Sequence, residues 1–572
     1  MTARIVRRES AGADAIPETV PALLRRIYAG RGVRDAAGLE LGLERLIPVR
    51  ELGNIDAAVA LLIRHFHAQG RITVIGDFDA DGATSTALMV RQLRRLGFAN
   101  VDFLVPNRFE YGYGLTPEIV ALAAGKQPAL IITVDNGISS HAGVDAATQA
   151  GIETLITDHH LPAATLPAAA VIVNPNSPGE AFPSKSLAGV GVAFYVMAAL
   201  TRAMQEQGLV AEPKPVADLL DLVALGTVAD LVALDHNNRI LVHQGLRRIR
   251  AGRCTVGIRA LLEVAGKRLE NVVASDLGFQ VGPRLNAAGR LDDMTIGIQC
   301  LITDDAASAR LLAGRLAQLN QDRKELELRM QQEALGTLAD MRADDDSLPL
   351  GLCLFEEDWH QGVVGLVASR VKERTHRPVV AFARADAGML KGSARSVPGV
   401  HIRDVLDAVA TRHPALIHRF GGHAMAAGLT LPAANLEAFR TAFDAEVRGW
   451  MTVDDAQGVI HSDGPLAAQD FTLDTARAVR EAGPWGQAFP EPTFDGRFSV
   501  VERRILGDRH LKLKLRAGGA VCEAIAFRYF DHAEAEDVAP GQQVEVAFRM
   551  DVNEYAGQER LQLLIEHLAL EK

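Results

Sequence analysis

The sequence predicts an α/β protein in which a parallel sheet is followed by a long helix, a second α/β unit and a small β-barrel. Three observations lead to this prediction. Short runs rich in β-branched residues alternate with helical patterns between about residues 46 and 300. A stretch without proline follows, from Asp304 to Asp345. Beyond about residue 460, short apolar runs are separated by glycine, aspartate and asparagine turns.

Five apolar runs are the predicted strands of the parallel sheet. They are Ile72–Ile75, Val101–Val105, Leu130–Val134, Thr154–Thr157 and Ala170–Val173. The intervals between these runs suit crossover helices. Asp77, Asp135 and Asp158 come directly after three of them. Because ligands of an open α/β sheet lie beyond the carboxyl ends of its strands, we expect these carboxylates to share one crevice.

The stretch from Asp304 to Asp345 has leucine and methionine at the steps of an amphipathic helix. A helix of roughly 40 residues would span about 60 Å. We expect it to connect two domains; packing inside one domain is the alternative. A second α/β unit is predicted from about Leu350 to Trp450, with strand-like runs at Gly351–Phe355 and Val379–Phe382.

The final stretch is predicted to form a five-stranded oligonucleotide-binding (OB) barrel. Its strand-like runs are Phe498–Val501, Leu511–Leu515, Val521–Phe527, Gln543–Phe548 and Leu561–Ile565. Such barrels bind single strands with basic and aromatic residues. The basic candidates are Arg503, Arg504, Arg509, Lys512 and Lys514, for each of which a solvated basic edge is the alternative. Trp485 is expected to pack between domains; a platform on which a base stacks is the alternative.

The composition fits a cytoplasmic protein of several domains. The chain has 572 residues, 48% of them hydrophobic, and a formal net charge of -11. Its most apolar region, Val216–Leu234, is interrupted by three aspartates, which argues against a membrane span. The four cysteines are far apart, which argues against a disulfide scaffold. The net charge does not exclude nucleic acid, because metal ions or a local basic groove can hold phosphates.

Three aspartates at alternate positions, Asp77, Asp79 and Asp81, follow the first predicted strand. They would repel one another at short range unless a divalent cation offset their charge. A calcium-binding EF-hand loop shares this pattern, but it requires a glutamate at its twelfth position, where this chain has Leu88. A solvated acidic turn is the remaining alternative.

Three further elements carry residues that can bind a metal ion, and two of them follow strands of the same sheet. Asp135 begins an Asp-Asn-Gly segment, which is often only a turn. His159 and His160 follow Asp158 at a strand end, and histidine is the commonest nitrogen ligand of transition metals. Asp230 ends a very apolar helix.

These four elements resemble the successive motifs of the DHH phosphoesterases, named for an Asp-His-His sequence such as residues 158–160. The second unit resembles their DHHA1 accessory domain in Gly362–Gly365, Gly392–Ser396, Gly421–His423 and Ala426–Gly428. The segment Gly282–Arg290 and the barrel narrow the resemblance to bacterial exonucleases specific for single-stranded DNA. The expected domains are an N-terminal extension (1–45), a DHH catalytic domain (46–300), the connecting helix (301–347), a DHHA1 substrate-binding domain (348–455) and an OB domain (456–572).

The resemblance implies two divalent metal ions, Mn²⁺ in preference to Mg²⁺, and a catalytic site of eight residues. The implied ligands are Asp77, Asp79, Asp81, Asp135, His159 and Asp230, with Asp135 bridging the two ions. The partition of the first three between the ions is left open. Asp158 is either a ligand or a group that orients a histidine. His160 is expected to face the scissile phosphate.

Substrate-binding residues are also implied. Arg284 and Arg395 are expected to grip phosphates through their forked guanidinium groups; a surface ion pair is the alternative for each. The remaining candidates are Asn286, Ser393, Gly421, Gly422 and His423. The two glycines would let backbone N–H groups approach a phosphate closely.

The function that the resemblance implies is 5′ to 3′ degradation of single-stranded DNA to mononucleotides, in DNA repair and recombination. The implied partners are single-stranded DNA-binding protein and a RecQ-type helicase, and the enzyme is expected to be a monomer. A non-catalytic scaffold is an alternative, although it would be expected to lose metal ligands. A phosphodiesterase acting on short oligonucleotides or cyclic dinucleotides is another, although such enzymes usually lack a barrel.

Overall fold

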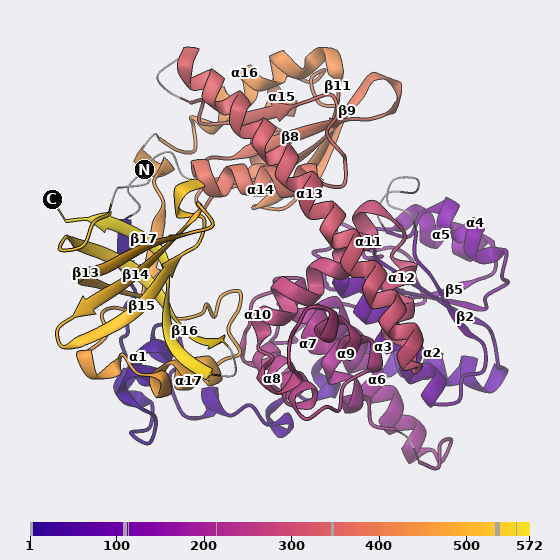
Figure 1. Ribbon diagram of the computed structural model, residues 1–572. Coiled ribbons are helices and arrows are strands. Elements are labelled where there is room, and N and C mark those ends of the chain that lie inside the picture. The colour runs from indigo at the N-terminus through magenta and orange to yellow at the C-terminus, as the bar shows by residue number, and fades with distance from the viewer. Residues whose placement is uncertain are drawn as a thin grey trace. The chain divides into compact units, whose positions relative to one another are not determined.

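The computed structural model describes residues 4–106, 111, 114–212, 214–344, 348–452, 454–531, 538–555 and 558–571 (Figure 1). The chain divides into two compact units. The larger unit comprises Arg7–Asn320, Ser462–Asp531 and Asp537–Lys572. The smaller unit comprises Met1–Val6, Gln321–His461 and His532–Glu536.

The parallel sheet of the larger unit has the strand order β3-β2-β4-β5-β6, with all pairs parallel, as predicted. Its strands are β2 (Ile72–Gly76), β3 (Val101–Leu104), β4 (Leu130–Val134), β5 (Glu153–Thr157) and β6 (Val171–Val173). Successive residues of a strand face opposite sides. Val74 therefore packs with α2 (Ile55–Ala68), α3 (Ala80–Arg95) and α6 (Gly189–Glu206), whereas Ile75 packs with α4 (Pro117–Ala124) and α5 (His141–Gln149). Both faces are buried, as in other parallel sheets.

The helices around this sheet are α2 (Ile55–Ala68), α3 (Ala80–Arg95), α4 (Pro117–Ala124), α5 (His141–Gln149) and α6 (Gly189–Glu206). A helical layer follows, with α7 (Leu220–Ala229), α8 (His236–Arg250), α9 (Val256–Val264), α10 (Ala274–Asp276), α11 (Gly282–Leu291) and α12 (Thr295–Ile302). The turn η7 (Leu277–Val281) between α10 and α11 is π-helical. None of the helices in the described parts of the chain is long and apolar enough to cross a membrane.

The predicted long helix is a single element, α13 (Ala306–Asp344). Ala309, Ala313 and Leu316 in its first half belong to the core of the larger unit. The boundary between the two units falls within α13, after Asn320. The helix therefore connects the units, as expected.

The smaller unit is built on a mixed sheet of order β10-β11-β9-β8-β7, in which only β7 and β8 are parallel. The strands are β7 (Leu352–Phe355), β8 (Val379–Arg384), β9 (Met389–Arg395), β10 (Arg419–Gly422) and β11 (Ala426–Pro432). The helices are α14 (Val364–Thr375), α15 (Ile402–Arg412) and α16 (Leu436–Val447). Phe382, Phe439 and Phe443 lie in its core. A separate two-stranded sheet pairs β1 (Arg4–Arg7) with β12 (Val459–Ser462).

The C-terminal strands close into a five-stranded barrel of order β13-β14-β15-β17-β16. They are β13 (Phe494–Leu506), β14 (His510–Ala517), β15 (Ala520–Ala526), β16 (Gln543–Tyr555) and β17 (Gln558–Leu570). The contact between β15 and β17 is parallel and the other pairs are antiparallel. The predicted OB barrel is confirmed.

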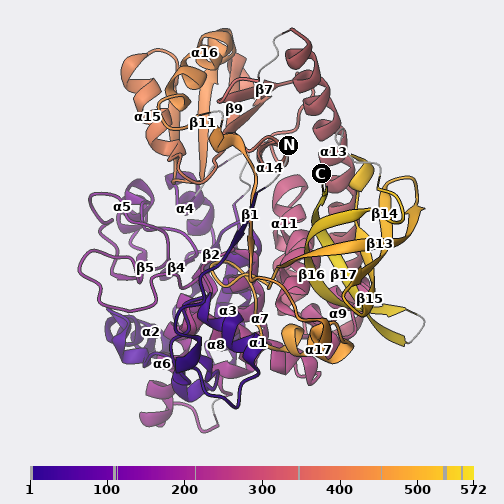
Figure 2. The ribbon, with the colours of Figure 1, turned by 90° about the vertical axis from the view of Figure 1, so that its left-hand side faces the viewer.

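The N-terminal segment packs on the barrel. Ile27 of α1 (Ala22–Ala29) lies in the barrel core with Val479 of α17 (Leu473–Glu481), and Figure 2 shows the two helices at one end of the barrel. Trp485 stacks on Tyr28 with a centroid distance of 6.2 Å, so it is a packing residue as predicted. These contacts join residues 22–29 to the C-terminal part of the chain.

Candidate metal centre

The loop between β2 and α3 holds the three alternating aspartates. Asp79 caps the first turn of α3, since its Oδ1 accepts a hydrogen bond from Gly82 N at 3.0 Å. A Cβ atom at Gly82 would lie 2.6 Å from the Asp77 carbonyl oxygen, so only glycine allows the loop to fold back this closely. Asp77 and Asp81 are buried.

Asp81 is held by a second helix. Its Oδ2 accepts a hydrogen bond from Gly189 N at 2.7 Å and its Oδ1 accepts one from Val190 N at 2.9 Å. These are the first residues of α6, where unpaired N–H groups favour an anion. Burial, and after it repulsion by Asp79, raises the pKa of Asp81 to about 7.

Asp135 follows β4 with an unusual backbone conformation, φ 62°. The left-handed region is uncommon for a residue with a side chain, and such strain clusters at functional sites. The Asp135 amide donates to Thr157 O at 3.0 Å, which ties it to the next strand end. Burial, together with repulsion by Asp81, Asp79 and other aspartates, raises the pKa of Asp135 well above its usual range.

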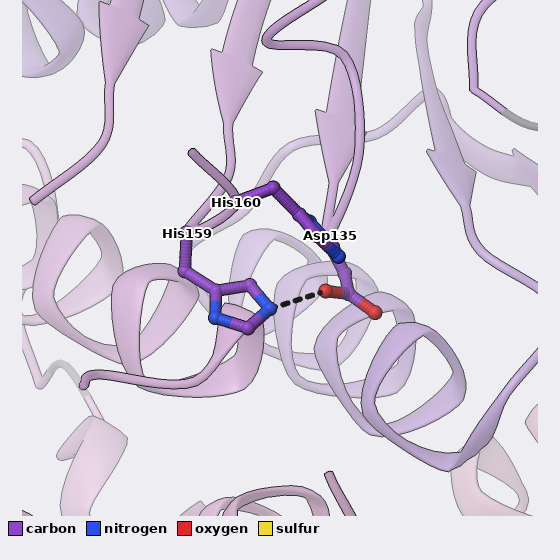
Figure 3. Close-up of side chains that lie close together, drawn as sticks. All are labelled: Asp135, His159 and His160. Atoms are coloured by element: carbon purple, nitrogen blue, oxygen red, sulfur yellow. Dashed lines mark ion pairs between the residues drawn. The ribbon is translucent and has the colours of Figure 1, made fainter. Parts of the chain in front are cut away.

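His159 brings the remaining carboxylates together. Its ring points toward Asp135, with 3.1 Å between Nε2 and Oδ1 (Figure 3). The same Nε2 lies 3.6 Å from Asp230 Oδ2 and 3.9 Å from Asp81 Oδ2. Asp230 forms the C-cap of α7. Four separate segments therefore come together at one point, and three of them are the strand ends that were expected to share one edge of the sheet.

The donor atoms form two principal groups. One comprises Asp77, Asp79 and Asp135, and the other comprises Asp81, His159 and Asp230; within each, the ligand atoms lie within 4.8 Å of one another. Asp135 also groups with His159 and His160, so it lies between the two sets. Carboxylate oxygen with one imidazole is a donor set that suits Mn²⁺ or Mg²⁺. Divalent cations would offset the mutual repulsion of these buried acids, so the residues fit the implied metals.

Asp158 has a different environment from the other acids. Its Oδ2 accepts from Ile138 N at 2.9 Å, and its Oδ1 accepts from His159 N at 2.7 Å and from His160 Nδ1 at 2.8 Å. Although burial opposes the shift, hydrogen bonding by His160 lowers the pKa of Asp158. The same hydrogen bond raises the pKa of His160 to about 9, against the effect of burial. These contacts favour the alternative that Asp158 orients the histidine.

Two predicted substrate residues lie on α11. Asn286 Oδ1 accepts a hydrogen bond from Ala80 N at 2.8 Å, so this side chain supports the aspartate loop. Only its amide nitrogen can then donate to a substrate. The Arg284 guanidinium donates to Gln280 O, and burial lowers its pKa.

The other predicted substrate residues lie in the smaller unit. Arg395 Nη1 donates to Ser393 Oγ at 2.9 Å and to Ala394 O at 2.8 Å. Strand register places Ser393 opposite Gly428, and Gly428 opposite Gly421, so these three share one face of the sheet.

Gly421 borders open space, since a Cβ atom there would meet no atom within 4 Å. Gly422 has φ 148° and ends β10. His423 N then donates to Ala426 O at 2.8 Å across the hairpin. Ser393, Arg395 and Gly421 therefore lie on one face of the sheet, whereas Gly422 pairs with Ala427 on the other face.

Two barrel lysines are engaged by neighbouring strands. Lys512 Nζ lies 2.8 Å from Glu523 Oε2, and Lys514 Nζ lies 2.5 Å from Glu502 Oε2. These ion pairs favour the interpretation that Lys512 and Lys514 belong to a solvated basic edge rather than to a surface that binds a single strand.

Sequence reasoning missed the groups that fix the aspartate loop. Gly189 and Val190 bind Asp81, and their glycine-rich helix start (Gly-Val-Gly) was a possible signal of an anion-binding N-terminus. Gly289 is another residue that the predicted site does not include. A Cβ atom there would lie 1.8 Å from Phe78 O, so α11 packs directly against the loop.

Comparison with known proteins gives matches along most of the chain. The family model for the DHH family N-terminal domain matches residues 71–227, that for the DHHA1 domain matches 349–449, and that for the RecJ OB domain matches 462–567. The single-stranded-DNA-specific exonuclease RecJ of Dickeya dadantii is 55% identical over 98% of both chains. The protein of the same name from Escherichia coli is 51% identical over 98% of both chains.

Solved structures agree with this result. The crystal structure of RecJ in complex with Mn²⁺ from Thermus thermophilus has a TM-score of 0.82 and 31% identity, covering 100% of this chain and 80% of that one. The structure of RecJ in complex with Mg²⁺ from the same source has a TM-score of 0.77 and 29% identity, covering 100% and 79%.

Proposed function

Because this chain belongs to the RecJ family of single-stranded-DNA-specific exonucleases, we propose that it degrades single-stranded DNA from the 5′ end to mononucleotides in DNA repair and recombination. The observation that carries the proposal is that the donor atoms form two groups, one of which contains Asp135 while the other brings His159 Nε2 to 3.1 Å from Asp135 Oδ1. Each group offers three ligand atoms for a hard divalent cation. Many enzymes that hydrolyse phosphodiesters use two such ions.

The grouping of donors also supports a partition of the ligands. Asp77 and Asp79 would hold one ion, Asp81, His159 and Asp230 would hold the other, and Asp135 would bridge them. When bound, Mn²⁺ or Mg²⁺ ions supply the positive charge that activates a water molecule and stabilises the attacking and leaving oxygens.

The protein's own groups position these ligands. The α6 N-terminus fixes both oxygens of Asp81, and Asn286 fixes the backbone of Ala80. Asp158 fixes the ring of His160 through Nδ1, and a third of the His160 side chain is exposed. We propose that Asp158 positions the His160 ring and that His160 faces the scissile phosphate.

The proposed substrate residues are Arg284, Asn286, Ser393, Arg395, Gly421, Gly422 and His423. A terminal phosphate carries more negative charge than an internal one and suits a forked donor such as a guanidinium. Arg395, already oriented by its bonds to Ser393 and Ala394, supports recognition of a 5′ phosphate.

We therefore predict that Arg395→Ala weakens binding more than it slows chemistry. KM for a 5′-phosphorylated strand should rise by about 10- to 150-fold, because a hydrogen bond to a charged group contributes about 1.5–3 kcal/mol. The saturated rate should change little. Steady-state kinetics on 5′-phosphate and 5′-hydroxyl strands check this, with the exposed Arg403→Ala as the matched control. A lower saturated rate at unchanged KM would contradict the assignment.

We also predict a strong preference for single strands over blunt duplexes. The ligands Asp81 and Asp135 are 1% and 2% exposed, so a phosphodiester must enter a buried site. A duplex end would have to separate first, at a cost of about 1.4 kcal/mol per base-pair step. Initial rates on the same labelled strand, alone and annealed, measure the preference. Equal rates without a helicase would refute it.

The need for separated strands supports two proposed partners, single-stranded DNA-binding protein and a RecQ-type helicase. We further propose a monomer in the cytoplasm, a compartment that suits four free cysteines. Binding measurements with each purified partner and the mass in solution test these points.

The direct test of the function is digestion of end-labelled single strands. A strand labelled at its 5′ end should release labelled mononucleotide first, and a strand labelled at its 3′ end should release its label last. Activity should require Mn²⁺ or Mg²⁺ and disappear with a chelator. Equal attack at both ends would overturn the polarity, and activity without divalent metal would overturn the mechanism.

A further inference from the structure

Phe279 is an aromatic side chain that the fold leaves in solvent. It is 74% exposed, whereas Phe527 and Trp450, which come next among the described aromatic residues, are 59% and 41% exposed. It lies in the π-helical turn η7. Such turns are rare and are found frequently at functional sites. An aromatic side chain that is exposed to solvent by such a turn indicates a site where a ligand binds.

The turn packs against the end of α7, the helix that leads to the metal ligand Asp230. A Cβ atom at Gly278 would lie 3.1 Å from Val228 Cγ1, and one at Gly282 would lie 3.1 Å from Ala229 Cβ. The two glycines therefore bring η7 into close contact with the two residues that precede Asp230. The position of Phe279 is fixed with respect to this ligand.

The helix that follows η7 reaches the other ligand group. Asn286 of α11 binds Ala80 N in the aspartate loop. Asn286 lies seven positions after Phe279, which corresponds to about 10 Å along a helix. A stacked strand advances about 3.4 Å per nucleotide, so this length spans roughly three nucleotides. A base bound at Phe279 would therefore lie within a few nucleotides of the metal centre.

The surroundings of Phe279 suit a nucleic-acid strand. Arg284 is anchored to the same turn through Gln280 O, and it can meet a phosphate while the ring meets a base. Leu231, directly after Asp230, is 67% exposed with φ 61°, and it adds apolar surface beside the ligand. Apolar surface next to a cation is the combination by which proteins hold single strands without reading their sequence.

We propose that Phe279 is a stacking platform for a nucleobase of the single-stranded substrate close to the scissile bond. The inference rests on the proposed function and adds a residue that holds the strand by its bases. It accounts for strand selectivity in part, because a base that is paired and stacked within a duplex does not offer its face to the ring.

The test is steady-state kinetics of Phe279→Ala and Phe279→Trp on a 5′-phosphorylated oligothymidylate. The Ala variant should raise KM by about 5- to 150-fold, the range for loss of one aromatic stacking contact, and leave the saturated rate within about twofold. The Trp variant should restore KM. Leu122→Ala, an exposed apolar residue on α4, is the matched control and should behave as wild type.

A second substrate series separates stacking from a structural role. Single abasic sites are placed at successive positions from the 5′ end. At one of these positions, the abasic site should raise KM of the wild type as much as the Phe279→Ala substitution raises KM on the intact strand. At the same position, the abasic site should not raise KM of the Phe279→Ala variant any further. Equal KM values for wild type and Phe279→Ala, or losses that multiply at every position, would overturn the inference. Failure of the wild type to degrade the intact strand would overturn the proposed function itself.

Discussion

Replacement of Asp135 by asparagine should lower the rate of cleavage at saturating substrate by at least about 10³-fold, or about 4 kcal/mol in activation free energy. The reason is its position between the two donor groups, where one side chain serves both proposed ions. Asparagine is the informative replacement because it tolerates the left-handed backbone at φ 62°, whereas Asp135→Ala adds strain there. Mn²⁺-dependent turnover of single-stranded DNA is the measurement.

The stability of the same variant distinguishes a lost metal site from a damaged fold. Burial and repulsion raise the pKa of Asp135, so its charged form destabilises the metal-free protein at neutral pH. Asp135→Asn should therefore melt no lower than wild type without metal, but it should lose most of the rise in Tm that Mn²⁺ produces. Asp145→Ala, an exposed aspartate on α5, is the control and should keep both activity and the Mn²⁺ effect. Near-normal turnover of folded, metal-loaded Asp135→Asn would rule out a bridging role.

Addition of one methyl group at Gly289 should reduce the saturated rate by about 10²-fold. The new Cβ atom would lie 1.8 Å from Phe78 O, so α11 or the loop of Asp77 and Asp79 must shift by more than an ångström. In enzymes that depend on the orientation of catalytic groups, a displacement of this size lowers the rate about 10²-fold. Turnover and the Mn²⁺ dependence of the Gly289→Ala variant are the measurements.

The control for this prediction is Gly314→Ala on α13, where a Cβ atom would meet nothing within 4 Å. Because alanine is favoured over glycine in a helix interior by about 1 kcal/mol, this variant should be at least as stable as wild type and fully active. Unchanged kinetics in Gly289→Ala would mean that α11 does not fix the aspartate loop.

Much of the fold could be predicted because local sequence patterns carry it. Alternation places Val74 and Ile75 on opposite faces of a sheet buried on both sides, and the acids that follow the strands must then lie at one edge. The barrel strands could be recognised for a similar reason, since apolar runs separated by turns are a local signal.

Contacts between distant segments could not be predicted. Arg31 and Asp463 form a buried ion pair 432 residues apart in sequence, and Ile27 lies in the barrel core. Nothing in the local pattern of residues 22–31 indicates this partner. The expectation of a simple N-terminal extension therefore said nothing of its packing on the barrel.

The sequence suggested candidate residues for the site, but it could not indicate how they would be grouped. Alternating Asp77, Asp79 and Asp81 are equivalent in sequence, and only the three-dimensional fold groups Asp81 with His159 and Asp230 and the other two with Asp135. The role of Asp158 was open for the same reason, because hydrogen bonds from Ile138 and His160 are not visible in a sequence.

We propose that two divalent cations bind next to Asp135, which would contact both. Anomalous diffraction from crystals grown with Mn²⁺, measured at the manganese edge, tests it most directly. We expect two peaks about 3.5–4 Å apart. One should lie among Asp77, Asp79 and Asp135, and the other among Asp81, Asp135, His159 and Asp230. A single peak at full Mn²⁺ saturation, or peaks that do not contact Asp135, would contradict it.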